Sequence, residues 1–400
     1  PGQAALLKPD GHLLRAGSVG PMGNGTFMGG GAGGLVEELD WDGNRVWRFD
    51  HSSTRHLSHH DIELLPNGNL LMIAWERKTR DEAIAAGRHP ELVGEQGLWP
   101  DSLIEVRPTP PEGGEIVWEW HVWDHLVQDR DPARPPYGDN AAHPSRINLP
   151  PPGWVDALTD DQREQLEALG YLPGEEKASE PVDRRHQHPD WNHINSVAYN
   201  PALDQIAVSV LGFNEVWIID HGTTTEEAAG RTGGRYGKGG DLLYRWGHPA
   251  AHGAREGTQT LFAQHDAHWI PDGRPGAGHL LLFNNGRGRP EGEYSSVDEL
   301  VLPQTEPGVY ARDETGGFAP ADRVWTSVAP EPASFYSPMI SGAQRLPSGN
   351  TLICSGSQGR LFEVTPDGET VWEHVLSQGA ASSRPPGPDM RARFLEGAFD

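Results

Sequence analysis

The sequence predicts an all-β fold, a six-bladed β-propeller that occupies residues 1–400 as a single domain, and two recurring phrases indicate the propeller. The first phrase is a turn followed by an apolar strand, and the second is a strand that carries a tryptophan. Glycine (50 residues) and proline (35 residues) together exceed a fifth of the chain, and both favour turns over helices. Repeated small antiparallel sheets around a central axis are therefore the expected architecture.

The first phrase combines a turn of Pro, Asn, Asp and Gly with an apolar run, which is typical of a hairpin strand. It recurs at residues 8–18, 65–74, 270–286 and 346–356, with a diverged copy at 199–210.

The second phrase follows each copy of the first, at residues 43–50, 114–121, 240–247, 321–328 and 368–375. A partner strand precedes most copies, so each unit is expected to hold four antiparallel strands. The tryptophans of the last strands are predicted to pack between neighbouring blades: Trp47, Trp118, Trp325 and Trp372.

Two segments fall outside this pattern. Residues 126–190 are Pro-rich and polar, and we expect them to form an insertion between blades two and three with one short helix at 159–172, capped by Thr159. Five units are countable, and a sixth blade is expected to be completed from the chain ends, with residues 376–400 supplying a strand. A five-bladed ring is the alternative.

Charge and composition exclude several classes of partner. Lys and Arg number 32 against 57 Asp and Glu, a formal net charge of −25, which would repel nucleic acid and anionic membrane surfaces. No apolar run is long enough to span a membrane, and the single Cys354 excludes an intrachain disulfide. No signal-peptide pattern is visible at the start of the chain. Small-molecule partners are expected, and association into a homo-oligomer stays open.

A column of polar residues precedes the turns of the repeat. Counting six residues back from each turn gives Gln3, His60, His193, His265 and Ser341. First strands of propeller blades line the central channel, so these side chains are predicted to form a ring at one height, joined by Asn195 from the strand of His193. Three imidazoles near a buried axis are costly unless they are partnered, and their presence favours a functional site over a structural one.

Other polar residues are weaker candidates. Arg287 and Arg289 follow the motif FNNG and are placed to reach an anion at the channel mouth, and strand alternation places Arg345 on the channel face, deeper than Ser341. His59 and His268 stand at odd offsets from the column and are predicted to point away from it. His268 is expected to be structural, and His59 at most to contact a ligand from the rim of the channel.

The set of motifs HHDIELLPNGN, WNHINSVAYNP, QHDAHWIPDG, FNNG and SGAQRLPSGNTLI resembles the bacterial arylsulfate sulfotransferases, the PAPS-independent kind, from residue 3 to about 375. The resemblance implies a six-bladed propeller, export to the periplasm or beyond, and no cofactor. It also implies transfer of a sulfuryl group from an aryl sulfate to a phenol by ping-pong chemistry on a histidine.

Carried over residue by residue, the resemblance makes His265 the nucleophile and makes His60 and His193 anion-binding histidines. Asn195 becomes an amide ligand and Ser341 the expected hydroxyl residue, with Gln3 and Arg345 as further candidates for substrate binding. The family carries an arginine about sixteen residues after the asparagine, and this chain has Leu211 there.

Two alternatives to sulfuryl transfer remain open from the sequence. One is a metal-dependent enzyme in which His60, His193 and His265 form a three-histidine site. The other is a secreted propeller without catalytic activity, since propellers host many unrelated functions.

Overall fold

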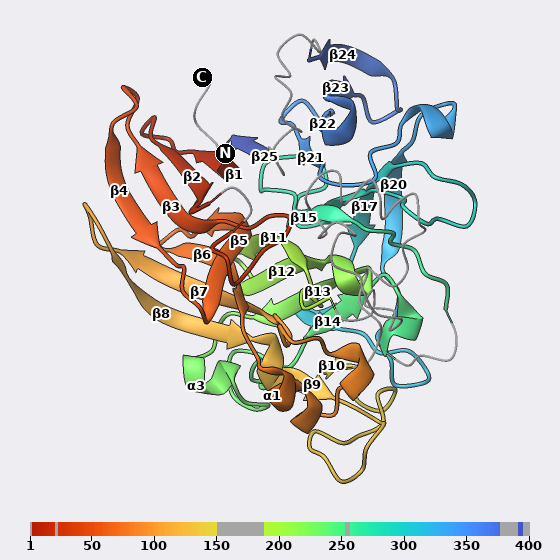
Figure 1. Ribbon diagram of the computed structural model, residues 1–400. Helices are drawn as coiled ribbons and strands as arrows, with labels where there is room; N and C mark the ends of the chain where they lie inside the picture. Colours follow the sequence, from red (N-terminus) through yellow and green to blue (C-terminus); the bar gives the residue numbers. More distant parts are fainter. Residues whose placement is uncertain (1, 21–22, 150–187, 253–256, 377–390, 395–400) are drawn as a thin grey trace, which may run out of the picture.

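The computed structural model describes residues 2–20, 23–149, 188–252, 257–376 and 391–394. Within these ranges, five sheets of consecutive antiparallel strands follow one another along the chain (Figure 1). An all-β propeller is thus confirmed. The first sheet contains β1 (Gly2–Leu7), β2 (Leu13–Ser18), β3 (Gly34–Leu39) and β4 (Arg45–Asp50), and the second contains β5 (His56–Leu64), β6 (Leu70–Glu76), β7 (Asp101–Pro108) and β8 (Gly114–His121).

The remaining sheets repeat this order, and the five sheets coincide with the five units counted in the sequence. The third contains β11 (Ile194–Asn200), β12 (Gln205–Val210), β13 (Glu215–Asp220) and β14 (Tyr244–Trp246). The fourth contains β15 (His265–Trp269), β16 (Leu280–Asn284), β17 (Ser296–Val301) and β20 (Asp322–Ser327). The fifth contains β21 (Gly342–Arg345), β22 (Thr351–Ser355), β23 (Arg360–Val364) and β24 (Thr370–Val375).

Short elements connect the strands of the described ranges. The α-helices α1 (Arg80–Ala85) and α3 (Thr225–Ala228) each begin at a threonine whose side chain forms a capping box with a glutamate. The remaining pieces are 3₁₀ turns and strand pairs: η1 (Pro90–Leu92), η2 (Val122–His125), η6 (Leu211–Phe213), η7 (Pro249–His252), η8 (Pro332–Ser334), η9 (Gly356–Gln358), β9 (Leu126–Val127), β10 (Ile147–Asn148), β18 (Gln304–Glu306) and β19 (Val309–Tyr310). No helix in the described part of the chain is long and apolar enough to cross a bilayer.

The hairpin turns explain the recurring first phrase. In the turn between β5 and β6, the Gly68 N–H donates to Leu65 O at 2.9 Å and Gly68 adopts φ +84°. Gly349 has the same role between β21 and β22, with φ +90° and a 3.0 Å bond to Leu346 O. Glycine tolerates this left-handed backbone without steric cost, which is why a glycine recurs in the phrase.

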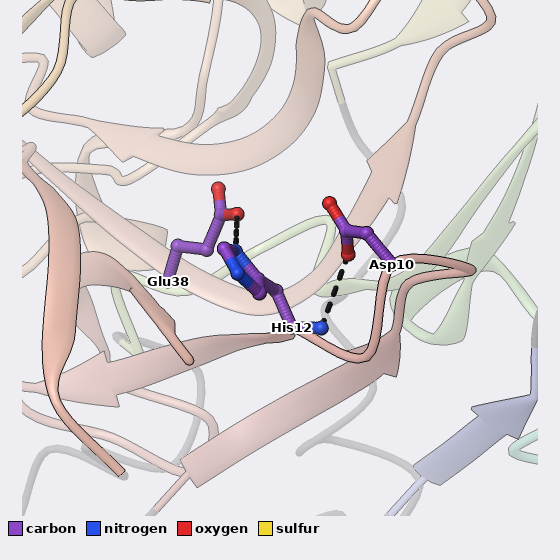
Figure 2. A group of neighbouring side chains, drawn as sticks. All are labelled: Asp10, His12 and Glu38. Atoms are coloured by element: carbon purple, nitrogen blue, oxygen red, sulfur yellow. Dashed lines mark hydrogen bonds and ion pairs between the residues drawn. The ribbon is translucent and has the colours of Figure 1, made fainter. Parts of the chain in front are cut away.

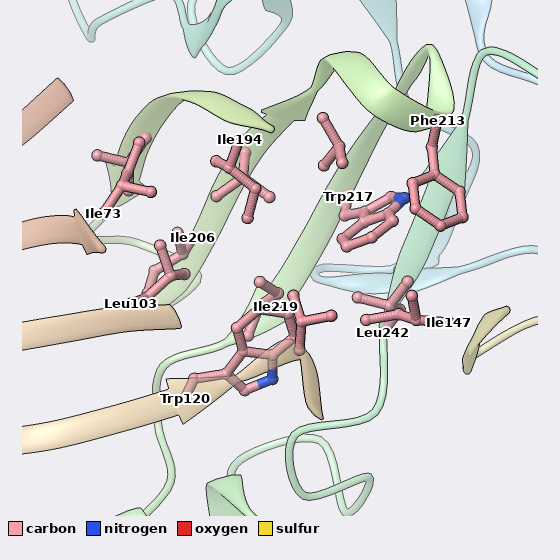
Figure 3. Packing of buried hydrophobic residues seen from close by; sticks show 14 of the residues in the cluster. Ile73, Leu103, Trp120, Ile147, Ile194, Ile206, Phe213, Trp217, Ile219 and Leu242 are labelled. Atoms are coloured by element: carbon pink, nitrogen blue, oxygen red, sulfur yellow. The ribbon is translucent and has the colours of Figure 1, made fainter. Parts of the chain in front are cut away.

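The hydrophobic cores lie between successive sheets rather than within them. Four clusters of buried residues join the first sheet to the second, the second to the third, the third to the fourth and the fourth to the fifth. Figure 3 shows the second interface, where Ile73, Leu103 and Trp120 of the second sheet face residues of the third sheet such as Ile206 and Ile219. The second, third and fourth sheets are therefore buried on both faces. The part of each sheet that faces the central axis is the edge formed by its first strand.

The repeated tryptophans pack at these interfaces in three of four cases. Each of the three donates its indole N–H to the next sheet or the loop beside it: Trp47 to Gly113 O (2.8 Å), Trp118 to Thr223 Oγ1 (3.0 Å) and Trp325 to Pro366 O (2.8 Å). The prediction is wrong for Trp372, which is 47% exposed on β24. Its sheet is the last of the five, and no further sheet covers that face among the described residues.

A separate sixth blade is not present in the described residues. The late strand β25 (Arg391–Phe394) pairs in parallel with β1 and so extends the first sheet. The chain ends do meet, as expected, but in an existing blade. Of the predicted insertion, residues 126–149 contain β9 and β10, a parallel pair outside the five sheets, and the helix predicted at 159–172 lies outside the described residues.

Candidate active site

The innermost strands of the second, third and fourth sheets are irregular at the predicted histidine column. Their pairing register shifts between His59 and Ile62, between Ile194 and Ser196, and between His265 and His268. Backbone angles beside these shifts are unusual for L-residues: φ is +53° at His60, +52° at His193 and +57° at Asp266. Such bulges redirect side chains and are common beside active sites.

Hydrogen bonds between neighbouring inner strands place the column in register. An acidic or hydroxyl side chain of one sheet accepts a backbone N–H of the next sheet in three successive pairs: Asp61 from Val197 (3.2 Å), Ser196 from Ala267 (3.0 Å) and Asp266 from Ala343 (2.9 Å). The residues that precede the three acceptors are His60, Asn195 and His265. In the third sheet, Asn195 therefore stands at the equivalent position, and His193 lies two residues earlier than the column predicted.

His60 and His193 lie against each other. Their ring centroids are 4.6 Å apart in an edge-on arrangement, and both residues are buried. Gly31 packs on the ring of His60 and accepts the His60 N–H at 2.9 Å. A Cβ at Gly31 would lie 2.0 Å from His60 Cε1, so only glycine fits while His60 keeps its place.

Asp190 sets the protonation of His193. The Asp190 carboxylate is 2.5 Å from His193 Nδ1, and its other oxygen accepts the Trp75 indole N–H at 3.0 Å. Burial alone would lower the pKa of His193, but the charge of Asp190 and this hydrogen bond raise it above its ordinary value. Burial likewise opposes ionisation of Asp190, yet the charge of His193 keeps the pKa of that carboxyl below its ordinary value. The pair thus favours the protonated, positively charged form of His193.

A second buried pair stands behind His60. His59 Nδ1 is 2.7 Å from His60 Nδ1, and His59 Nε2 is 2.8 Å from Asp101 Oδ1. The other oxygen of Asp101 accepts the Ile194 N–H at 2.8 Å, and the His59 ring stacks on Trp75 at 4.1 Å. His59 does point away from the column, but into the protein, where it contacts His60, and not towards the rim.

His265 is held in one tautomer. Its Nδ1 is 2.8 Å from Asn285 Oδ1 and 3.0 Å from Ala263 O. The amide nitrogen of Asn285 donates to Ser337 O (2.7 Å) and Ile340 O (2.8 Å), so the Asn285 oxygen must face the ring. Both partners of Nδ1 are acceptors, and Nδ1 therefore carries the proton. In the neutral ring, Nε2 is then the nitrogen with the lone pair.

The other predicted ring members are tied into the scaffold. The Asn195 amide donates to Gln264 O at 2.9 Å, one residue before His265. Ser341 Oγ lies 2.8 Å from Ser337 Oγ and accepts the Gly356 N–H at 2.9 Å. Gln3 lies on β1 at a register shift between Gly2 and Ala5, and its side chain is outside the described set.

The prediction that Arg345 faces the channel is wrong. Its guanidinium pairs with Glu299 of β17 at 2.5 Å and lies over the Trp325 ring at 5.0 Å. Both partners belong to the fourth sheet, so Arg345 is buried between two blades. The physical reason is that both faces of a blade pack against neighbouring blades. Side chains that alternate along the first strand therefore point towards one neighbouring blade or the other, and not into the channel.

Of the arginines after FNNG, Arg287 is close enough to His193 to affect its titration. Its charge lowers the pKa of His193, against the larger effects of burial and Asp190. Arg289 instead stacks on Tyr294 at 4.3 Å. Leu211, where the family arginine would be, is buried and donates its backbone N–H to His193 O at 3.1 Å.

The three histidines do not form a preformed metal site. Of the residues that the structure describes, the one group that brings three ligand atoms within 4.8 Å of one another is Asp10, His12 and Glu38 (Figure 2). The ammonium of Lys8 lies 2.7 Å from Glu38 and 3.2 Å from Asp10, so this surface group already binds a cation of the protein itself. The geometry gives no support to a three-histidine metal enzyme.

Comparison with known proteins gives one family and several distant structures. A family model described as Arylsulfotransferase (ASST) matches residues 8–379. No curated protein matches the sequence. Similar solved structures include a protein of unknown function from Bacteroides caccae (12% identity, 94% of this chain and 82% of that chain, TM-score 0.42), and the periplasmic gluconolactonase PpgL of Pseudomonas aeruginosa (12%, 94% and 72%, 0.41). The beta-propeller domain of Myceliophteria thermophila Cps50 (Swd1) is a third (9%, 99% and 76%, 0.39).

Proposed function

The chain belongs to the arylsulfotransferase (ASST) family, and from that premise we propose that it transfers a sulfuryl group from an aryl sulfate to a phenol through a sulfohistidine at His265. The observation that carries the proposal is the fixed tautomer of His265, which places the lone pair of the neutral ring on Nε2, the nucleophilic nitrogen. Membership of the family implies a transferase. Periplasmic or extracellular location is part of the same proposal.

The chemistry follows from the groups around His265. In the first half-reaction, Nε2 attacks the sulfur, the sulfur–oxygen bond to the aryl group breaks, and the bond electrons leave with the phenolate. Sulfuryl transfer resembles phosphoryl transfer in needing in-line geometry and neutralisation of charge on the equatorial oxygens. The imidazolium of His193 and the guanidinium of Arg287 supply that charge. In the second half-reaction, the acceptor phenol takes the sulfuryl group from Nε2.

The covalent intermediate gives the direct test. With p-nitrophenyl sulfate and no acceptor, we expect a burst of nitrophenol equal to the amount of protein. Peptide mapping should find the mass of one sulfuryl group on the peptide that contains His265, and a phenol acceptor should remove it. A burst without an adduct, an adduct on another residue, or no reaction would each contradict the proposal. The last of these would favour the non-catalytic alternative.

Arg287 is predicted to contribute to donor affinity in place of the arginine that Leu211 has replaced. A charge-assisted bond to an anion contributes about 1.5–3 kcal/mol, so Arg287→Gln is expected to raise the KM for aryl sulfates at least about tenfold. The pKa of His193 should rise as well, because Arg287 lowers it in the native protein. The matched control is Arg289→Gln, whose guanidinium stacks on Tyr294. Equal KM values for the two variants would rule out this role.

A further inference from the structure

Three buried residues of the second sheet form an unbroken hydrogen-bonded row. Asp101 Oδ1 is 2.8 Å from His59 Nε2, and His59 Nδ1 is 2.7 Å from His60 Nδ1. The side chains of Asp101 and His59 are fully buried, and His60 is only 2% exposed. Because Nδ1 of His60 bonds to His59, any proton that His60 exchanges with a substrate must pass through Nε2.

The row has two arrangements, and the second holds one proton fewer than the first. In one, the Asp101 carboxyl donates to His59, His59 Nδ1–H donates to His60, and His60 Nε2 carries a proton. In the other, Asp101 is ionised, His59 Nε2–H donates to it, and His60 Nδ1–H donates to His59. Both arrangements satisfy the two distances and leave both imidazoles neutral.

We propose that Asp101, His59 and His60 form a proton relay that protonates the departing phenolate in the first half-reaction and deprotonates the acceptor phenol in the second. This inference rests on the proposed sulfuryl transfer at His265. His60 is the group that touches the substrate, and His59 and Asp101 are positioning residues that act through it.

The protons balance over the two half-reactions. As the sulfur–oxygen bond breaks, His60 Nε2–H passes to the phenolate oxygen, His59 Nδ1–H passes to His60 Nδ1, and the Asp101 proton passes to His59 Nε2. The negative charge then rests on Asp101 while the sulfurylated ring of His265 is positive. The acceptor phenol reverses each transfer, and no proton need come from bulk water.

The charges around the relay favour a protonated Asp101. Burial, followed by the charge of Asp190, raises the pKa of Asp101 well above its ordinary value, while His193 acts in the opposite direction and Glu76 adds to the rise. Burial lowers the pKa of His59 to about 3, opposed by Asp190 and assisted by His193. His59 is therefore suited to pass a proton without becoming charged.

Leaving-group dependence separates a relay from a structural role. Asp101→Asn keeps an acceptor for the Ile194 N–H and a donor for His59 but cannot change its protonation, and His59→Gln interrupts the row at its centre. The test uses the burst rate of the first half-reaction, measured without acceptor, because the second half-reaction needs the relay whichever donor is used. With p-nitrophenyl sulfate, whose phenolate needs no proton to depart, we expect the burst rates of both variants to stay within about threefold of the native burst rate. With phenyl sulfate, the rate should fall by about 10²-fold or more, the usual contribution of general acid catalysis.

The control is His125→Gln. His125 is also buried, stacks on Trp120 and bonds to a carboxylate, Asp241, at 3.0 Å, but it belongs to η2 and has no bond to the cluster. This variant should show the native ratio of the two rates. Equal falls for both donors in Asp101→Asn and His59→Gln, or no fall for either, would overturn the relay. Thermal melting of each variant checks that the fold is intact, and the two substitutions give independent readings.

A measurement without turnover distinguishes failure of the relay from failure of the proposed function. In the ¹⁵N-labelled native protein, the shared proton should give a nitrogen–nitrogen coupling between His59 Nδ1 and His60 Nδ1, and the coupling should be lost in His59→Gln. Coupling without turnover of any aryl sulfate would contradict sulfuryl transfer and leave only the hydrogen-bonded row in place. Turnover without coupling, or with a native leaving-group ratio in both variants, would contradict the relay alone.

Discussion

Replacing His265 with glutamine is expected to reduce aryl sulfate turnover by about 10⁴-fold or more, because removing a covalent nucleophile leaves only binding and charge stabilisation. Glutamine is polar and of similar length, and its amide N–H can still donate to Asn285 Oδ1, so the site should keep its shape. His125→Gln is the matched control, since it also removes a buried, hydrogen-bonded imidazole. The measurement is the steady-state rate with p-nitrophenyl sulfate and phenol. Equal melting temperatures of the variants and the native protein show that the fold is intact.

The same experiment extends to the residue that fixes the tautomer. Asn285→Leu removes one of the two acceptors described at Nδ1 and keeps Ala263 O, so we expect a fall of about 10²–10³-fold, less than the cost of the wrong tautomer in a catalytic triad. Because Asn285 acts only through His265, adding Asn285→Leu to His265→Gln should cost nothing further. A further fall in the double variant would mean that Asn285 acts on the substrate independently of His265.

The sequence predicted the parts of the fold that repeat. Five turn phrases and five tryptophan phrases correspond to five sheets, because a hairpin turn needs the same residues wherever it occurs. The sixth blade was inferred from the chain ends and from the family resemblance, and the late strand β25 instead pairs with β1. Trp372 was also predicted wrongly, because a tryptophan at this position is buried only when another sheet packs on that face of its own sheet.

Site residues could be predicted from the sequence where they occupy equivalent positions before the repeated turns. His60 and His265 were found because they precede equivalent turns, whereas Asn195 was found only beside His193. Asp101 and Asn285 carry no comparable signal. Asp101 begins the third strand of its sheet and Asn285 follows the second strand of another, and each reaches its histidine only through strand pairing. Arg345 was predicted at the wrong place because the alternating side chains of a first strand point towards the two neighbouring blades, and Arg345 pairs with Glu299 of one of them.

The second large effect is expected in stability and concerns Glu215. This buried carboxylate accepts hydrogen bonds from Trp217 Nε1 (2.7 Å) and from Arg245 Nε (2.9 Å) and Nη2 (2.5 Å), and its other oxygen bonds to His252 Nδ1 (3.1 Å). Its backbone oxygen accepts the side-chain N–H of Gln264, the residue before His265, at 2.9 Å. The ion pair therefore supports the third sheet at the point where it holds the candidate nucleophile.

Glu215→Gln is expected to lower the free energy of unfolding by about 3–5 kcal/mol, because it leaves the guanidinium of Arg245 buried without a counter-charge. The matched control is Glu373→Gln, which removes an exposed ion pair with Arg360 of 2.7 Å and should cost at most about 1 kcal/mol. Denaturant unfolding at neutral pH gives both values. Equal losses in the two variants would show that the buried pair has no special weight.

The pH dependence of the same variant provides a check with a defined sign. Burial would raise the pKa of Glu215, but Arg245 and then His252 lower it to about 2, against an ordinary value of 4.5. A carboxyl with a depressed folded pKa contributes its full stability above the unfolded pKa and loses that contribution as the pH falls through the folded pKa. The native protein should therefore lose about 3 kcal/mol from this group between about pH 5 and pH 2. In Glu215→Gln that part of the acid slope should be absent, so the two unfolding curves should converge at low pH, and curves that stay parallel would contradict a charged Glu215.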